Sequence, residues 1–244
     1  MAKGIRLPIT MTDREKLLGF GYALIDLFLL PSLLSGLNDL LAQPLSMAWI
    51  NFLYFALNFL FLSAIFHRFL KRSIAYGGKN ITQLFGAGFL GFVGYWVANF
   101  ILSFCILRLF PDYANPNDGS IAEMTGGNFP MMAIGTVLFV PMAEELIHRG
   151  LVFGLLLPKS KTAAYVISAA VFAAVHVVGY LGSAQELTLV LAFIQYLPAG
   201  LVLGWAYEKS GTIFAPMMIH TACLSVIKPV FTNPTTMTVV ADDD

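Results

Sequence analysis

Four side chains able to do chemistry lie together in an otherwise apolar stretch, residues 129–157: Glu144, Glu145, His148 and Arg149. Glu145 and Arg149 are spaced i and i+4, so they lie on one helical face and can form an ion pair. Glu144 points away from that pair, which leaves its carboxylate free to face a cavity. A carboxylate held in this way can serve as a general base or as a metal ligand.

Two histidines lie in two other apolar stretches, His176 in AAVFAAVHVVGY and His220 in FAPMMIHTACLS. Counted from the lysines that flank the loops, Glu144 and His176 both lie ~22 Å from the membrane boundary, and His220 lies ~16 Å from it. Glu and His bind zinc with one position open for water, and the same residues can activate water by general base catalysis. The sequence therefore predicts a hydrolytic centre assembled from three helices.

His148 also forms an ExxH pattern with Glu145, the unit used by di-iron carboxylate bundles. Such a site needs a second ExxH and two more carboxylates, and no other ExxH occurs in the chain. We therefore do not expect a di-iron site.

The composition predicts where such a centre would be embedded. Of 244 residues, 58% are hydrophobic and only 11% are charged, against about 25% charged in an ordinary soluble domain. The net charge of zero gives no electrostatic basis for binding nucleic acid. Two cysteines in apolar runs do not make a disulfide framework. These features predict an integral membrane protein.

The predicted fold is all-α, a polytopic transmembrane helical bundle with about seven spans (six to eight), since each span needs ~20 apolar residues. The fourth span is long and charged, and it is either two shorter helices or one helix kinked near Pro141. The expected spans are Leu17–Gly36, Ser46–Phe66, Leu84–Leu107, Phe129–Leu157, Ala163–Leu181, Leu187–Tyr207 and Ile213–Phe231.

Lys and Arg are unevenly divided between alternate loops. Outside Arg149, eleven of the thirteen fall on one side, which by the positive-inside rule is cytoplasmic, together with the amino terminus. We expect three regions: N-terminal transmembrane helices and a polar loop (1–128), a catalytic transmembrane core (129–231) and an acidic tail (232–244).

At the polar residues the sequence resembles the CPBP family of intramembrane proteases. This family groups type II CAAX prenyl endopeptidases with bacterial Abi-type and bacteriocin-immunity proteins. Its first motif, two Glu followed after three residues by Arg, matches Glu144, Glu145 and Arg149. Its second motif, Phe and then His after three residues, matches Phe172 and His176.

The third family motif is matched only in part. It is a His followed after three residues by Asn or Asp; His220 is present, but Leu224 stands at the fourth position. Loss of one oxyanion donor costs roughly 10²–10³ in rate. Either Thr221 or Ser225 supplies the donor instead, or the protein is a weak or non-catalytic member.

The resemblance implies roles for a set of five residues: Glu144, Glu145, Arg149, His176 and His220. Glu144 and His176 would activate the hydrolytic water, His220 would stabilise the oxyanion, and the pair Glu145 and Arg149 would support them. Zn²⁺ or another divalent metal held by Glu144, His176 and His220 is one possibility, and a metal-independent glutamate protease is the other. The expected partners are a peptide or membrane-protein substrate and the lipid bilayer of a bacterial cell.

Three functions stay open at this stage. The first is an endopeptidase, whose substrate could be a prenylated CAAX-type protein. The second is a non-catalytic bacteriocin-immunity or interaction protein, and the third is a proton-coupled transporter, since intramembrane Glu and His also form proton relays. The charge count places the site in the outer half of the bilayer, whereas CAAX processing is chemistry open to the cytosol.

Overall fold

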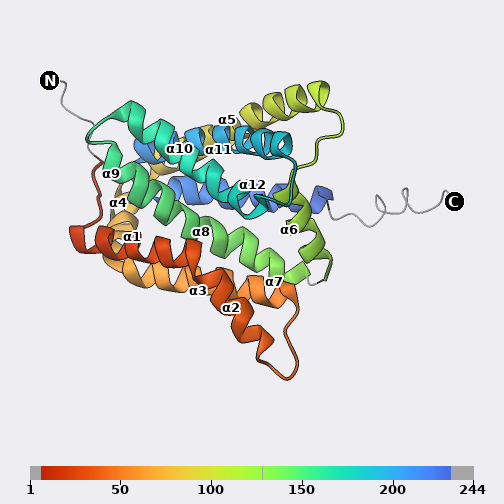
Figure 1. Cartoon of the computed structure of the whole chain (residues 1–244). Coiled ribbons are helices and arrows are strands. Elements are labelled where there is room, and N and C mark those ends of the chain that lie inside the picture. The colour runs from red at the N-terminus through yellow and green to blue at the C-terminus, as the bar shows by residue number, and fades with distance from the viewer. Residues whose placement is uncertain (1–6, 128, 232–244) are drawn as a thin grey trace.

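The structure, a computed structural model, describes residues 7–127 and 129–231, and within these ranges the regular elements are all helices (Figure 1). This confirms the predicted all-α bundle. The acidic tail, residues 232–244, lies outside the described residues, and the boundary proposed near residue 128 stays a prediction.

Five helical segments of the described chain are long and apolar enough to cross a membrane: α3 (Met47–Ile65), α5 (Ile81–Leu109), the segment Pro130–Leu156, α10 with η3 (Lys161–Tyr180) and α11 (Glu186–Ser210). A sixth span results if the bent pair α1 and α2 counts as one. Within the residues whose side chains are described, α12 (Phe214–Phe231) has a shorter apolar stretch, Phe214–Ser225. The chain is thus a polytopic membrane protein, and the seventh predicted span corresponds to α12.

The first predicted span is broken into α1 (Asp13–Phe28) and α2 (Leu30–Asp39), which meet at an angle of 48°. Pro31 lies in the first turn of α2. Proline has no N–H to donate and clashes with the carbonyl one turn earlier, so a straight helix does not pass through it. The predicted first span, Leu17–Gly36, therefore corresponds to a bent pair of helices that is apolar and long enough to cross the membrane only when the two are taken together.

The fourth span is a single helical rod through the middle of the bundle (Figure 1). Its parts are α7 (Phe129–Ile134), the π-helix η1 (Gly135–Phe139), α8 (Val140–Glu145), the π-helix η2 (Leu146–Phe153) and α9 (Gly154–Leu156). The wider π turn ends just before Pro141, whose ring and missing N–H disturb the preceding α turn. Of the two predicted alternatives, the structure has one helix and not two shorter ones, and the disturbance near Pro141 takes the form of π turns.

Two helices form in segments expected to be loops: α4 (His67–Lys79) and α6 (Pro116–Gly127). α4 is amphipathic: it buries Phe69 and Ser73 and exposes a basic face, which is typical of a helix lying at the membrane surface. The basic residues of α4 are Arg68, Lys71, Arg72 and Lys79.

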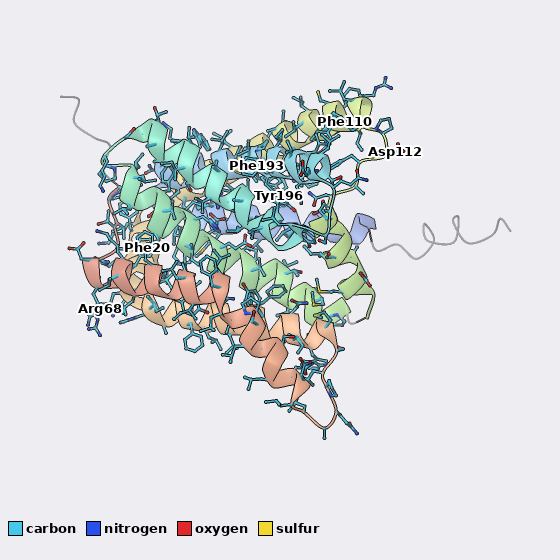
Figure 2. The ribbon with its side chains drawn as sticks, in the orientation of Figure 1. Phe20, Arg68, Phe110, Asp112, Phe193 and Tyr196 are labelled. Atoms are coloured by element: carbon cyan, nitrogen blue, oxygen red, sulfur yellow. The ribbon has the colours of Figure 1, made fainter. Side chains whose placement is uncertain are left out.

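Three of the basic residues expected on the cytoplasmic side lie together in the described chain: Lys16 and Lys159 line one pocket with Thr10, whose carbonyl accepts a hydrogen bond from Arg72. Figure 2 shows Arg68 at the end opposite Phe110 and Asp112. At the Arg68 end, the Gln83 amide donates a hydrogen bond of 2.5 Å to the carbonyl of Lys209, which joins the start of α5 to the end of α11. This grouping agrees with the charge count that predicted the orientation.

Close packing of α10 on α11 depends on Gly200. A Cβ placed there would lie 2.6 Å from the backbone Cα of Ala169, a contact that neither helix can relieve by turning a side chain. Small residues that let helix backbones approach are the usual basis of packing in lipid.

We predict that Gly200→Ala lowers the stability of the detergent-solubilised protein by about 1–3 kcal/mol, the usual cost of overpacking. The measurement is thermal unfolding followed by circular dichroism. Gly94→Ala is the matched control, because a Cβ at Gly94 meets nothing within 4 Å. Equal midpoints for the two variants would contradict the prediction.

Candidate active site

The Glu144 carboxylate, on α8, faces the two predicted histidines from two other helices. Its Oε1 lies 3.9 Å from His176 Nε2, on α10, and its Oε2 lies 3.8 Å from His220 Nε2, on α12. The expected meeting of these side chains inside the bundle is therefore observed. Their side chains are only 23%, 13% and 8% exposed, respectively.

In each neutral imidazole, the hydrogen bond made by Nδ1 determines whether Nε2 carries a proton or a lone pair. His176 Nδ1 lies 2.7 Å from the Phe172 carbonyl, which can only accept, so Nδ1 carries the proton. His220 Nδ1 lies 3.0 Å from the Glu145 carboxylate, which likewise accepts. In the neutral rings both Nε2 atoms therefore present lone pairs toward Glu144.

Glu144 and the two Nε2 atoms are thus three acceptors facing one another. Glu144 Oε2 is buried and, among the described residues, has no hydrogen-bond partner. A buried acceptor without a donor is costly, so this arrangement favours a proton-bearing species between the three groups. A water molecule has two protons to donate, so it can satisfy two of these three acceptors at a time.

A buried ion pair between Arg149 and Glu145 lies next to the group formed by Glu144, His176 and His220. Arg149 Nη1 donates a hydrogen bond of 3.0 Å to Glu145 Oε1, and both side chains are 0% exposed. The same Oε1 accepts from His220, so the pair also orients that ring. Arg149 Nη2 lies 3.4 and 3.3 Å from the carbonyls of Ala199 and Gly200 on α11. The i, i+4 pair predicted from the sequence is therefore present.

Phe172 is the side chain around which these groups pack. The Arg149 guanidinium lies 4.4 Å above the centre of its ring. Three imidazoles surround the same ring at centroid distances of 4.6 Å (His176), 5.2 Å (His148) and 5.8 Å (His220). The phenylalanine of the second motif thus contacts both the guanidinium of the charged pair and all three imidazoles.

His148 takes a different position from the other two histidines. Its Nδ1 lies 2.8 Å from the backbone carbonyl of Glu144, in its own helix, and its ring meets Phe172 edge-on. These contacts connect it to the helix and to Phe172 rather than to the Glu144 carboxylate.

The turn after His220 bears on the missing oxyanion donor. Leu224 is partly exposed on α12. The Ser225 hydroxyl donates a hydrogen bond of 2.7 Å to the Thr221 carbonyl, so it is already committed to the helix backbone. Of the two alternative donors predicted from the sequence, Ser225 therefore already has its hydroxyl proton engaged.

Sequence reasoning missed Tyr196, on α11. Its ring stacks on His176 with centroids 4.2 Å apart and an interplanar angle of 28°. Its hydroxyl accepts a hydrogen bond of 2.9 Å from Asn117 and lies 3.4 Å from Asp118, both on α6. No motif or periodicity marks Tyr196, since only the packing of α11 on α10 brings it to His176.

The three groups named as metal ligands, Glu144, His176 and His220, have the donor chemistry of a zinc site. Within the described residues, however, no group of three or more His, Cys, Asp or Glu side chains is arranged to hold a metal ion. We therefore derive no catalytic step through a metal from these positions.

Fold and site together define a polytopic helical membrane protein in which a carboxylate and two imidazoles converge between helices. Residues 126–226 match the family model described as type II CAAX prenyl endopeptidase Rce1-like. The match covers the fourth span through most of α12 and confirms the family resemblance carried by the motifs. No curated protein matches the chain, and no solved structure matches it.

Proposed function

We propose that the protein is an intramembrane endopeptidase that hydrolyses a peptide bond of a membrane-associated substrate, with a prenylated CAAX-type protein as the first candidate. The observation that carries the proposal is the Glu144 carboxylate, which faces two imidazole nitrogens at 3.9 and 3.8 Å and whose Oε2 has no hydrogen-bond partner among the described residues. The family match over residues 126–226 supports the same activity.

In the proposed reaction, a water molecule lies between Glu144 and the two histidines. Glu144 takes one proton from the water as general base, and the oxygen attacks the carbonyl carbon of the scissile peptide. The Nε2 atoms of His176 and His220 both face this water, and one of them accepts a hydrogen bond from its second proton, which orients the attacking oxygen. The protonated Glu144 then gives its proton to the leaving amine, which closes the cycle without net change in the protein.

The testing experiment is a cleavage assay on purified protein in liposomes. The substrates are two quenched fluorescent peptides of the same CAAX sequence, one prenylated on its cysteine and one not, and mass spectrometry identifies the bond cut. We expect cleavage by the wild type and none by Glu144→Gln. A parallel arm with a chelator decides whether a metal is needed. Failure to cleave either peptide or membrane proteins of the same cell would overturn the proposal.

The partial third motif gives a further prediction. Leu224→Asn places an amide donor one turn after His220, and we expect kcat to rise, up to the ~10²-fold that one oxyanion donor supplies. Leu224→Met is the control, because it keeps the apolar character and the approximate volume. An unchanged kcat in Leu224→Asn would mean that the oxyanion is stabilised from another position.

Leu224 also favours a second candidate, a bacteriocin-immunity or interaction protein that acts without proteolysis. This candidate predicts that a variant lacking both Glu144 and His176 still protects cells against a bacteriocin. The measurement is survival of cells that express the Glu144→Ala, His176→Ala double variant at the wild-type level. Loss of protection would exclude a purely non-catalytic role.

A further inference from the structure

We propose, on the basis of the function proposed above, that Tyr196 is a positioning residue for His176 and that α6 in turn holds Tyr196. Tyr196 does not face Glu144 itself. It acts through the plane of the His176 ring, which sets the direction of the Nε2 lone pair toward the catalytic water.

The His176 ring is held on two sides. Tyr196 stacks on it at 4.2 Å and 28°, and Phe172 contacts it at 4.6 Å and 50°. One hydrogen bond, from Nδ1 to the Phe172 carbonyl, fixes the edge of the ring that points away from Glu144. A hydrogen bond at one atom leaves the His176 ring free to tilt about that atom. The stacking of the ring on Tyr196, with 28° between the two planes, fixes the tilt.

The hydroxyl of Tyr196 reaches beyond the transmembrane core to α6. Asn117 donates to it over 2.9 Å, and it lies 3.4 Å from Asp118 Oδ1, an acceptor. Ser120, one turn further along α6, accepts a hydrogen bond of 3.0 Å from the Tyr180 hydroxyl at the end of α10. α6 is therefore bonded both to the helix that carries Tyr196 and to the end of the helix that carries His176.

The residue preceding Tyr196 is tied to the same segment. Gln195 accepts hydrogen bonds from the Tyr113 hydroxyl, at 2.8 Å, and from Asn115, at 2.9 Å. Burial, together with the nearby Asp118 charge, raises the pKa of Tyr113 to about 12, so its hydroxyl keeps the proton that it donates. The segment 113–120 thus forms hydrogen bonds with two successive residues of α11, Gln195 and Tyr196, and these bonds limit rotation of the Tyr196 ring.

The experiment compares variants in the liposome assay described above. Tyr196→Leu removes the stack, and we expect kcat to fall by up to ~100-fold with KM unchanged, since small misplacements of a reacting group have effects of this size. Tyr196→Phe keeps the stack and should retain most of the activity. Phe193→Leu is the matched control, because Phe193 also lies on α11 (Figure 2) and, among the described residues, no ring pair joins it to the site.

A second readout does not depend on turnover. Diethyl pyrocarbonate modifies neutral imidazoles, and mass spectrometry gives the rate at His176. We expect faster modification in Tyr196→Leu than in the wild type, and no change in Phe193→Leu. Unchanged modification and kcat in Tyr196→Leu would overturn the inference and leave the protease proposal standing. Absence of wild-type cleavage would overturn the protease proposal, while the modification rates would still test the role of Tyr196.

A milder pair tests the link to α6 if Tyr196→Leu does not fold. Asn117→Ala and Tyr196→Phe each remove one end of the same hydrogen bond, so both should raise the modification rate of His176 slightly. Tyr196→Phe also removes the hydrogen bond to Asp118, and Asn117→Ala also removes the one that Tyr180 donates. Because the two changes share one interaction, the double variant should show less than the sum of the two single effects. Additive effects, or no effect of either change, would overturn the link between α6 and His176.

Discussion

Glu144→Gln is expected to reduce cleavage to the level of the blank. Glutamine has nearly the same shape as glutamate, but its amide does not accept a proton from water, and general bases contribute roughly 10²–10⁴ in rate. Its NH₂ group can donate to one of the Nε2 lone pairs that face position 144, at 3.8 and 3.9 Å from the carboxylate oxygens. The variant should therefore fold as well as the wild type or better, which separates loss of chemistry from loss of structure.

The control for this variant is Glu186→Gln, which makes the same chemical change at an exposed position in the first turn of α11. We expect unchanged turnover there. Both proteins are compared by initial rate with the prenylated peptide and by thermal unfolding in detergent. Wild-type turnover by Glu144→Gln would exclude Glu144 as the general base, and with it the reaction proposed here.

The local part of the site could be predicted from the sequence because helical geometry fixes it. Glu145 and Arg149 are four residues apart on one helix, and they form an ion pair of 3.0 Å in the structure. The contact of Glu144 with two histidines distant in the sequence was also predicted, because side chains at equal depth in neighbouring spans of one bundle lie close together. Helices that span a membrane cross it in nearly the same direction. The number of residues between a side chain and the loop therefore gives its approximate depth in the membrane.

The rest depends on packing that no local pattern encodes. Tyr196 is twenty positions from His176 and meets it only because α11 lies against α10. The helix α6 has three glycines among its twelve residues and begins with Pro, Asn and Asp, so its segment has the composition of a loop. Its hydrogen bond to the Tyr196 hydroxyl joins residues far apart in the sequence. The π turns around Pro141 were missed for another reason. A proline in the sequence indicates a disturbed helix, but it does not indicate whether the helix breaks, kinks or forms a π turn.

Arg149→Met is expected to destabilise the protein by about 3–5 kcal/mol, the usual cost of leaving a buried charge without its partner. The change strands Glu145, whose side chain is 0% exposed and whose Oε2 already lacks a hydrogen-bond partner. It also removes the guanidinium from the face of Phe172 and the hydrogen bonds to α11. Thermal unfolding in detergent measures the loss.

Two comparisons isolate the buried charge as the cause. Lys16→Met breaks an ion pair of 2.8 Å with Asp13, whose side chain is 99% exposed, and such exposed pairs contribute only about 0–1 kcal/mol. The double variant Arg149→Met, Glu145→Gln removes both charges, so it should recover part of the stability lost by Arg149→Met alone. Because Glu145 also orients His220 at 3.0 Å, that recovery should not extend to kcat. If the double variant regains stability but not activity, the Glu145 and Arg149 pair has two separable roles. It stabilises the helical bundle, and it orients the His220 imidazole toward the water.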